Sequence, residues 1–458
     1  MIKSVVVFFM GLSALVATAE EPANLEAFRE ARFGMFIHFG LYSLLGGSWR
    51  GRRTDRAFGE WIQNHMRIPG AEYAQLAKVF NPQEFDPDDW AKRAKDAGME
   101  YVVLTAKHHE GFALFATKAS EFDVMDATPF KHDIVGEFAA ACRRHGLKVG
   151  LYYSQFLDWH EPDGGDPTKP GIDPSAKRAI REDGTGRGNT WDFPDAVNKD
   201  FERYFRAKAY PQIRELLTNY GDIFLIWFDT PSGMSPEQSR GFREYVREIS
   251  PQTIVSGRIG HGYGDFCTMG DNELVTNRSD VARESAMTLN NTWGFRYDDH
   301  NWKSPYTVAT ILAQNLSHGA NVLLNVGPRP EGRFPDAACD ILAELGTWRR
   351  RTGFAIHGVK ASPFKDDFPW GWCMIAPGNV LQLVIREEWT RDIVLEGVAN
   401  RVTACTSPYE QTGGRIVIKP SQEPDLMPRV IRVTLDGAPE VRDVLVIFAH
   451  NDVSQTQK

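Results

Sequence analysis

The sequence has no excess of basic residues and few cysteines. Its 458 residues include 52 Lys and Arg against 60 Asp and Glu, which gives a net charge of −8. Because proteins that bind nucleic acid usually present a basic face, this balance argues against a nucleic-acid partner. No metal-ligand spacing and no disulfide framework appears among the five cysteines, Cys142, Cys267, Cys339, Cys373 and Cys405, so we expect buried free thiols.

Long apolar runs are missing beyond the N-terminus. Residues 1–19 combine a basic start at Lys3, an apolar stretch at 5–16 and the small residues Ala17-Thr18-Ala19. This pattern predicts a secretory signal peptide, and the stretch is too short for a comfortable membrane span. We therefore expect a secreted or periplasmic protein without a membrane span.

Several motifs of catalytic chemistry are also absent. The sequence has no phosphate-binding loop of Walker type, no Gly-x-Ser-x-Gly turn and no helical pair of histidines with a glutamate base. The glycines at 260–264 form too weak a pattern for a dinucleotide site. We accordingly expect neither a metal ion nor a cofactor.

From about residue 30 to residue 350, apolar strands alternate with amphipathic helices. Strands are predicted at 33–39, 101–107, 148–154, 222–229, 253–258 and 321–326, and helices at 88–97, 134–145, 198–219, 236–248, 305–317 and 336–350. This alternation is typical of a parallel sheet. Its length favours a (β/α)8-like barrel over 20–355 rather than an open, doubly wound sheet.

The pattern changes after residue 355 to short alternating strands. They are predicted at 380–386, 392–395, 401–406, 415–419, 429–435 and 444–449, with Pro and Gly turns between them. This spacing predicts an antiparallel β-sandwich over 356–458. A packing role for it is favoured over a glycan-binding role, because only Trp370 and Trp372 suggest a sugar platform.

Asp229 is the first catalytic candidate. It ends the apolar run Asp-Ile-Phe-Leu-Ile-Trp-Phe-Asp at 222–229. A charged group at the tip of a buried strand is costly unless it is paired or takes part in chemistry. In a parallel barrel, that tip is also where active sites lie.

Other polar residues follow neighbouring strands. They are His38, the pair His108 and His109, Tyr153, Trp227 and Arg258. Taken singly, a histidine is more often a satisfied core residue, and an arginine is often half of a structural ion pair. Their shared rim favours a site. A carboxylate among side chains that hydrogen-bond or stack on sugars suggests glycoside hydrolysis, which needs a second carboxyl group as proton donor.

Several segments resemble the α-L-fucosidases of glycoside hydrolase family 29. The matching segments are RFGMFIHFG at 32–40, EW at 60–61, KHHEGF at 107–112, LYYS at 151–154, WFD at 227–229 and NVLLNVGP at 321–328. The resemblance covers nearly the whole mature length. It implies a catalytic barrel followed by a β-sandwich, and an exo-acting enzyme that removes terminal α-L-fucosyl residues from glycans.

The resemblance also implies site residues. Asp229 would be the nucleophile, and the residues that contact fucose would be His38, Glu60, Trp61, His108, His109, Tyr153, Trp227, Arg258 and Trp293. The sequence matches the family less closely around the residue that would be the acid/base catalyst. Asp271 is the preferred proton donor, with one residue inserted before it, and Glu273 is its rival. Glu284 matches another acidic position, which looks more structural.

A retaining double displacement would follow, with the two carboxyl groups about 5–5.5 Å apart. The donor should have a raised pKa, whereas Asp229 must stay ionised with the help of Arg258. The alternatives are a related glycosidase acting on L-galactosides or modified fucose, and a non-catalytic secreted carbohydrate-binding protein. Loops 41–60, 156–195 and 259–275 are expected to set linkage preference.

Overall fold

The computed structural model describes residues 21–165, 188–195, 198–231, 233–420 and 425–442. The predicted signal peptide at 1–19 and the predicted strand at 444–449 therefore lie outside the described residues. No helix within the described ranges is both long enough and apolar enough to cross a membrane.

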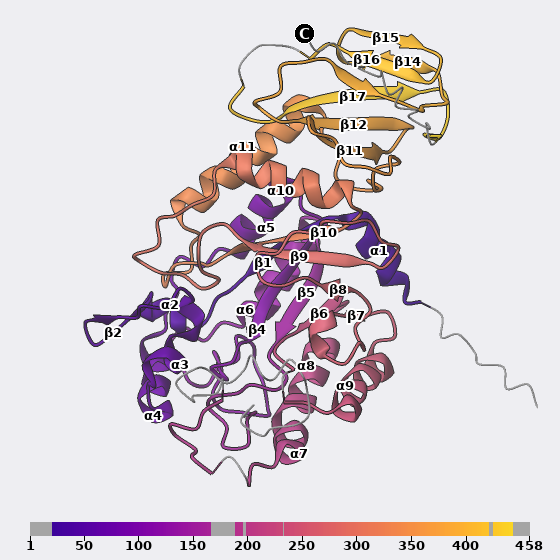
Figure 1. The fold of residues 1–458 in the computed structure, drawn as a ribbon. Helices are drawn as coiled ribbons and strands as arrows, with labels where there is room; N and C mark the ends of the chain where they lie inside the picture. The colour runs from indigo at the N-terminus through magenta and orange to yellow at the C-terminus, as the bar shows by residue number, and fades with distance from the viewer. Residues whose placement is uncertain (1–20, 166–187, 196–197, 232, 421–424, 443–458) are drawn as a thin grey trace, which may run out of the picture.

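The first part of the chain forms one parallel sheet that curls into a barrel (Figure 1). The strand order is β7-β6-β5-β4-β1-β10-β9-β8. The strands are β1 (Phe33–Ile37), β4 (Tyr101–Lys107), β5 (Lys148–Tyr153), β6 (Leu225–Phe228), β7 (Ile254–Val255), β8 (Cys267–Thr268), β9 (Arg283–Thr288) and β10 (Asn321–Val326). A parallel bridge between Ser256 and Phe266 joins the two edges of the sheet, which confirms the predicted (β/α)8-like architecture.

Helices surround this sheet, as Figure 1 shows. They are α1 (Ala23–Ala31), α5 (Pro87–Ala97), α6 (Ile134–Arg144), α7 (Phe201–Tyr204), α8 (Tyr210–Asn219), α9 (Pro236–Ile249), α10 (Pro305–Ser317) and α11 (Asp336–Thr352). Short helices α2 (Tyr42–Leu45), α3 (Ile62–Met66) and α4 (Gly70–Tyr73) follow β1. Capping residues fix where several helices begin. At the N-terminus of α5, the Asp86 carboxylate accepts hydrogen bonds from the backbone amides of Asp88 and Asp89, and Pro87 is the first helical residue.

Alternation along each strand separates two apolar layers. Residues facing the barrel interior, such as Phe36, Tyr152 and Trp227, form one buried cluster. Their neighbours in sequence, such as Ile37 and Tyr153, join a larger cluster between sheet and helices. Side chains two residues apart therefore share a face, and the last interior residue of each strand faces the barrel mouth.

Two barrel strands, β8 and β9, were not predicted. Strand β9 carries Arg283, Glu284, Ser285 and Thr288, a polar composition that does not suggest a buried strand. Its six residues are nevertheless buried, because the carboxylate of Glu284 accepts hydrogen bonds inside the barrel. The predicted strand at 253–258 is also shorter, since a 3-10 turn at Gly257–Ile259 carries Arg258.

Antiparallel sheets follow the barrel (Figure 1). One consists of β11 (Gly371–Ala376), β12 (Val380–Ile385), β17 (Arg429–Leu435) and β14 (Val402–Cys405), and the other of β13 (Ile393–Leu395), β16 (Arg415–Ile418) and β15 (Tyr409–Thr412). Leu383 and Ile416 lie in an apolar cluster that the two sheets share, as in a sandwich. Trp372 joins the barrel cluster instead, so this part packs against the barrel helices.

The cysteines are not all buried. All five are free thiols, and Cys142 and Cys373 are buried as expected. Cys267 is exposed, however, because it lies on the short edge strand β8, and Cys339 and Cys405 are half-buried.

Candidate active site

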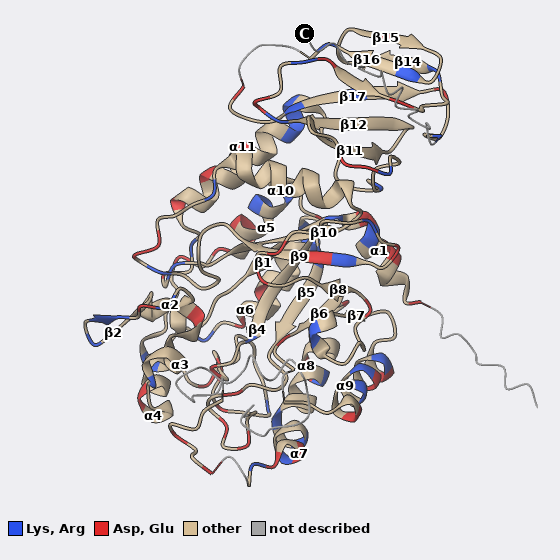
Figure 2. Ribbon diagram, in the orientation of Figure 1, with Lys and Arg blue, Asp and Glu red and all other residues tan. Residues whose placement is uncertain are grey.

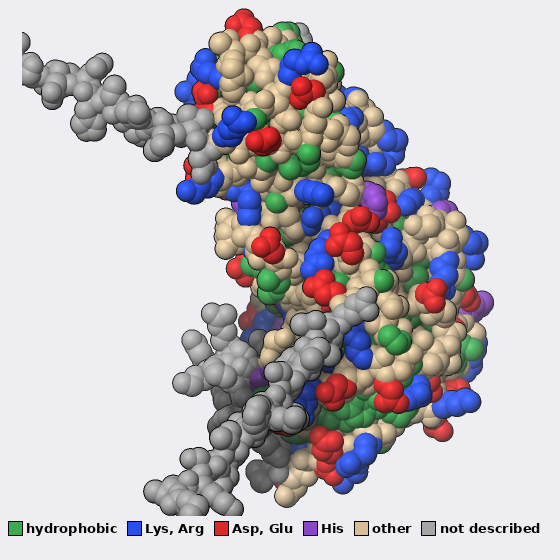
Figure 3. Space-filling view, turned by 90° about the vertical axis from the view of Figure 1, so that its right-hand side faces the viewer, with side chains coloured by type: hydrophobic (Ala, Val, Ile, Leu, Met, Phe, Trp, Pro, Cys, Tyr) green, Lys and Arg blue, Asp and Glu red, His purple; other side chains and the backbone are tan. Residues whose placement is uncertain are grey.

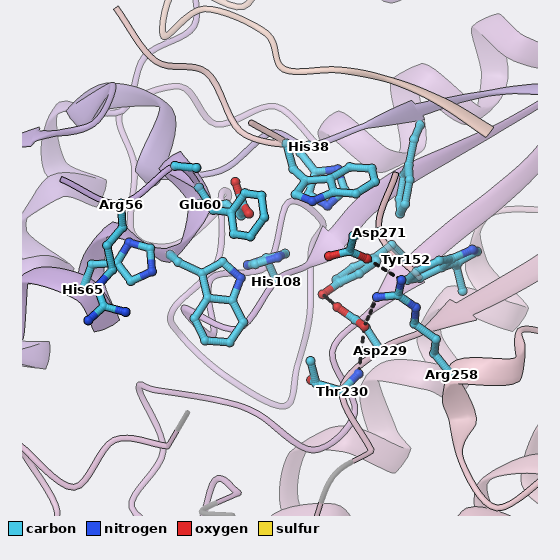
Figure 4. Close-up of a pocket in the computed structure, with 16 residues that line it drawn as sticks. His38, Arg56, Glu60, His65, His108, Tyr152, Asp229, Thr230, Arg258 and Asp271 are labelled. Carbon is cyan, nitrogen blue, oxygen red and sulfur yellow. Dashed lines mark hydrogen bonds and ion pairs between the residues drawn. The ribbon is translucent and has the colours of Figure 1, made fainter. Parts of the chain in front are cut away.

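The barrel mouth holds a cavity of about 710 Å³. Figure 4 draws its 16 lining residues. They are Phe36, His38, Arg56, Ala57, Phe58, Glu60, Trp61, His65, His108, Tyr152, Trp227, Asp229, Thr230, Arg258, Asp271 and Trp293. Most residues predicted for the site therefore meet in one cavity. Three do not line it: His109, Tyr153 and Glu273.

Asp229 follows β6 directly and is held by several donors. Its Oδ2 accepts from the Tyr152 hydroxyl at 2.9 Å, and its Oδ1 accepts from the Thr230 amide at 2.8 Å and from Arg258 Nη1 at 3.2 Å. Thr230 has a φ of +48°, a left-handed conformation that a β-branched residue rarely adopts. Such strain concentrates at functional sites, where surrounding contacts enforce it.

Arg258 joins two carboxylates. One guanidinium nitrogen binds Asp229 Oδ1, and Nη2 binds Asp271 Oδ1, as the dashed lines in Figure 4 show. The guanidinium also lies over the Trp227 ring, 5.0 Å from its centroid. Burial lowers the pKa of Arg258, but the two aspartates outweigh it and raise that pKa above its usual value. Arg258 is therefore a permanent cation between two acids.

The other two acidic candidates differ from Asp271 in position. Glu273 is exposed, and its Oε2 accepts from the Gly270 amide at 2.9 Å, within its own turn. Glu284 lies inside the barrel, where its carboxylate accepts from Tyr101 Oη at 2.5 Å and from Trp227 Nε1 at 2.9 Å. Burial raises the pKa of Glu284 to about 7. Of the three acids, only Asp271 lines the cavity.

Histidines form one side of the cavity. The Asn325 amide nitrogen donates to the Trp293 carbonyl, so Asn325 Oδ1 faces His38 Nδ1 at 2.7 Å and accepts from it. Burial lowers the pKa of His38 to about 4, and it lowers that of His108 well below its usual value. A neutral His38 that donates through Nδ1 keeps Nε2 as an acceptor.

His109 lies behind Asp229 rather than in the cavity wall. Its Nδ1 contacts Ser154 Oγ at 2.6 Å, and the Ser154 hydroxyl donates to the Leu157 carbonyl. Because that hydroxyl has one hydrogen, Nδ1 of His109 is the donor in the first contact. Its Nε2 then lies 3.6 Å from Asp229 Oδ2.

Glu60 and Trp293 lie on connected loops. Glu60 Oε2 accepts from the Gly294 amide at 2.8 Å, and the Gly59 amide donates to Thr292 Oγ1. Burial raises the pKa of Glu60 to about 8, and Oε1 of Glu60 has no hydrogen-bond partner. A protonated Glu60 can thus donate a hydrogen bond to a ligand at neutral pH.

Tyr153 was wrongly predicted to line the cavity. Its hydroxyl donates to Gln212 on α8 at 2.8 Å, on the outer face of β5. Tyr152 takes the expected place, because neighbouring residues of a strand point to opposite faces. Tyr152 is the parallel partner of Trp227, so placing Trp227 in the cavity would have identified it.

Sequence reasoning also missed Arg56, Phe58 and His65. They line the cavity and flank Glu60 and Trp61 in the sequence, where no strand pattern marks them. Asn325 was part of the matched NVLLNVGP segment but was given no role. Within the described residues, no group of three or more His, Cys, Asp and Glu side chains could hold a metal ion.

The cavity suits a small polar ring with one apolar face. It combines hydroxyl-binding groups such as Glu60 and His38 with aromatic rings such as Trp293, whose centroid lies 5.3 Å from that of His38. Such mixed polar and aromatic walls are typical of specific small-molecule sites. A sequence model of the α-L-fucosidase family matches residues 15–353.

The chain belongs to the α-L-fucosidase family. Tissue α-L-fucosidase of Mus musculus is 29% identical over 361 residues, which cover 73% of this chain and 71% of the relative. The crystal structure of α-L-fucosidase from Vibrio sp. strain EJY3 aligns with a TM-score of 0.83 and 30% identity, over 92% of this chain and 74% of that chain.

The α-L-fucosidase of Lactobacillus casei, in complex with α-L-fucose, is 44% identical, with a TM-score of 0.66 over 72% of this chain and 99% of that chain. Members of this family are glycoside hydrolases, so the chain is an enzyme of that class, acting on α-L-fucosides.

Proposed function

We propose that this enzyme removes terminal α-L-fucosyl residues from glycans by a retaining double displacement. Asp229 is the nucleophile in this proposal, and Asp271 is the acid/base. The observation that carries it is the single guanidinium of Arg258, which contacts both carboxylates at the cavity. Retaining glycosidases need two carboxyl groups about 5–5.5 Å apart, and the shared guanidinium keeps these two carboxylates close together.

In the first step, Asp229 attacks the anomeric carbon while Asp271 protonates the departing oxygen. The Tyr152 hydroxyl, the Thr230 amide and Arg258 all donate to Asp229, which fixes the direction of its carboxylate. Water then hydrolyses the fucosyl ester, and Asp271 acts as the base. Asp271 has access to that water, because its side chain is 40% exposed.

Fucose recognition uses the remaining cavity residues. His38 Nε2 is an acceptor for one sugar hydroxyl, and the protonated Glu60 is a donor to another. His108 and Trp61 bind further hydroxyls. Trp293 and Trp227 contact the apolar face of the ring and its methyl group, because aromatic rings exclude water there. This wall favours fucose over L-galactose, which has a hydroxyl at that position.

Glycans are the natural substrate class in this proposal. A variant of the Lactobacillus casei enzyme has also been solved in complex with Fuc(α1,6)GlcNAc. That complex supports a fucosylated saccharide as the substrate here.

The first test uses para-nitrophenyl α-L-fucoside and the corresponding α-L-galactoside. We expect the wild-type chain to hydrolyse the fucoside faster, and Asp229→Asn to lower kcat by more than about 10³-fold while still binding fucose. Trapping with a 2-fluoro-fucosyl donor, followed by peptide mass spectrometry, should label Asp229. A label on another carboxylate, or near-normal turnover by Asp229→Asn, would contradict the nucleophile assignment.

A further inference from the structure

Gln155 is a neutral polar residue that is buried next to Asp229 and Arg258. Charged residues lie mostly on the helices and loops around the sheet in Figure 2, and Figure 3 shows both signs interspersed on one face of the molecule. Gln155 instead follows the end of β5 by two residues and is 0% exposed. A buried side-chain amide is costly unless it is hydrogen-bonded, so the partners of Gln155 indicate its role.

Both ends of the Gln155 amide bind the backbone of neighbouring strand ends. Its Oε1 accepts from the backbone amide of Asp229 at 2.9 Å, and its Nε2 donates to the backbone carbonyl of Arg258 at 3.3 Å. Nε2 also lies 3.6 Å from Met234 Sδ, in the loop that follows Asp229. A backbone amide needs an acceptor and a carbonyl needs a donor, so these partners fix which end of the side-chain amide is the oxygen.

Asp229 and Arg258 lie beyond the paired part of their strands. The pairing of β6 extends to Phe228 on the side of β5 and to Ile226 on the side of β7. Asp229 follows the last residue of β6, and Arg258 lies in the 3-10 turn after β7. The Gln155 amide therefore continues the connection between these strand ends past the last pairs of the sheet.

The two backbone segments that Gln155 connects also carry the side chains that meet in the cavity. Arg258 Nη1 lies 3.2 Å from Asp229 Oδ1, and Nη2 binds Asp271, as Figure 4 shows. Thr230, the next residue in the chain, has a φ of +48°, a conformation that surrounding contacts must enforce. Because Gln155 binds the backbone of both Asp229 and Arg258, loss of its amide would let the guanidinium shift relative to the carboxylates.

We propose that Gln155 is a positioning residue for the nucleophile. Its amide keeps the backbones of Asp229 and Arg258 at a fixed separation, so that one guanidinium reaches Asp229 and Asp271 together. Gln155 is not among the residues that line the cavity, so it acts through these groups and not on the sugar. A displacement of about 1 Å at the reacting groups can cost about 10²-fold in rate. The inference rests on the proposed function, since it takes Asp229 as the nucleophile and Asp271 as the acid/base.

Two substitutions of Gln155 test this role. Gln155→Met has a similar shape but neither hydrogen-bonding group. In Gln155→Glu, a protonated carboxyl group can still accept from Asp229 and donate to Arg258, whereas an ionised carboxylate cannot donate. Gln212→Met is the matched control, because Gln212 is also 0% exposed but binds Tyr153 on the outer face of β5. Values of kcat and KM are measured with para-nitrophenyl α-L-fucoside, and fucose binding by competitive inhibition, at temperatures at which circular dichroism shows folded protein.

We expect Gln155→Met to lower kcat by about 10²-fold, while KM and the inhibition constant of fucose stay near their wild-type values. Gln212→Met should lose stability in urea unfolding but keep kcat near the wild-type value. The rate of Gln155→Glu relative to the wild type should rise as the pH falls, because protonation restores the donor and burial moves this titration toward neutral pH. A purely structural role would produce neither the split between kcat and KM nor this pH dependence.

A folded Gln155→Met variant with near-normal kcat would overturn the inference while leaving the proposed function intact. So would a Gln155→Glu variant whose rate relative to the wild type does not change with pH. Because Gln155→Glu keeps the shape of the side chain, it decides the question if Gln155→Met does not fold. Failure of the wild type to hydrolyse any fucoside, the nitrophenyl compound included, would instead contradict the proposed function.

Discussion

At the residue scale, Asp271 and Glu273 are two positions apart but face different surroundings. Asp271 lines the cavity beside Arg258, whereas Glu273 binds the Gly270 amide of its own turn. We expect Asp271→Asn to lower kcat by about 10²–10⁴-fold on a natural fucoside, the usual range for general acid–base catalysis. Glu273→Gln should keep wild-type rates and serves as the matched control.

The Asp271 prediction has a second readout. para-Nitrophenol departs with little protonation, so Asp271→Asn should impair the first step less with this substrate. Added azide should then restore turnover by attacking the fucosyl ester, giving a fucosyl azide that can be measured by mass spectrometry. Azide rescue of the Glu273 variant alone would assign the proton donor to Glu273 instead.

Adjacent tyrosines on β5 offer a second matched pair. The Tyr152 hydroxyl donates to Asp229 Oδ2 at 2.9 Å, whereas the Tyr153 hydroxyl donates to Gln212 behind the sheet. Tyr152→Phe should lower kcat/KM by about tenfold or more, since a hydrogen bond to a charged group is worth about 1.5–3 kcal/mol. Tyr153→Phe should reduce stability in urea unfolding but leave kcat/KM near the wild-type value. The reverse result would restore the original prediction for Tyr153.

At the scale of elements, a buried ionic cluster holds the loop after β5. Lys107 Nζ lies 3.0 Å from Asp158 Oδ2, and Lys208 Nζ lies 2.9 Å from the same oxygen. These side chains are at most 3% exposed. Burial lowers the pKa of Lys107 to about 8 even though Asp158 opposes it. The amide of the next residue, Trp159, donates to the His109 carbonyl at 2.7 Å, so the cluster fixes the wall behind Asp229.

We expect Asp158→Asn to destabilise the protein by about 3–5 kcal/mol, because two buried ammonium groups lose their common partner. The loop carrying Trp159 should loosen, so kcat/KM should fall even at temperatures where the variant is folded. Urea unfolding and activity at low temperature separate the two effects. Asp88→Asn is the control, because Asp88 forms an exposed pair with Arg144, for which little loss is expected. Equal stability of the two variants would contradict the role of the cluster.

At the scale of the whole molecule, the architecture was predictable because its strands are apolar runs. Strands β4 and β10 were predicted with the correct bounds, since each is an unbroken buried segment. Strand β9 was not, because its buried Glu284 depends on partners distant in sequence, Tyr101 and Trp227. Tertiary contacts of this kind leave no periodic signal in a single sequence.

The site residues likewise divide into those that the sequence predicts and those that it does not. Asp229 could be chosen from its place at the end of an apolar strand, and His38 from the rim that strand ends share. Arg56 lies on a loop whose course depends on hydrogen bonds from Arg296, 240 positions away in sequence. Loop conformations set by such distant contacts are beyond local pattern reasoning.

Three buried carboxyl groups make the stability of the whole molecule depend on pH. Burial raises the pKa to about 8 for Glu60, about 8 for Glu110 and about 7 for Glu284, from 4.5 in each case. Between those values, the folded state binds more protons than the unfolded state, so stability falls as pH rises. Histidines with lowered pKa values, such as His38, act in the opposite direction only up to about pH 6.5, their ordinary pKa.

The carboxyl effect should therefore dominate between about pH 6.5 and 8, because Lys107, whose pKa is lowered to about 8, opposes it mainly above that value. We expect the free energy of unfolding, measured by urea titration, to decrease steadily across this window. Glu110→Gln should flatten that slope whatever its effect on absolute stability, because Glu110 binds Tyr73 and the Leu41 amide outside the cavity. An exposed acid replaced in the same way, Glu248→Gln on α9, should leave the slope unchanged. A free energy of unfolding that increases with pH would mean that these carboxyl groups are ionised in the folded protein. An unchanged slope in Glu110→Gln would mean the same for Glu110.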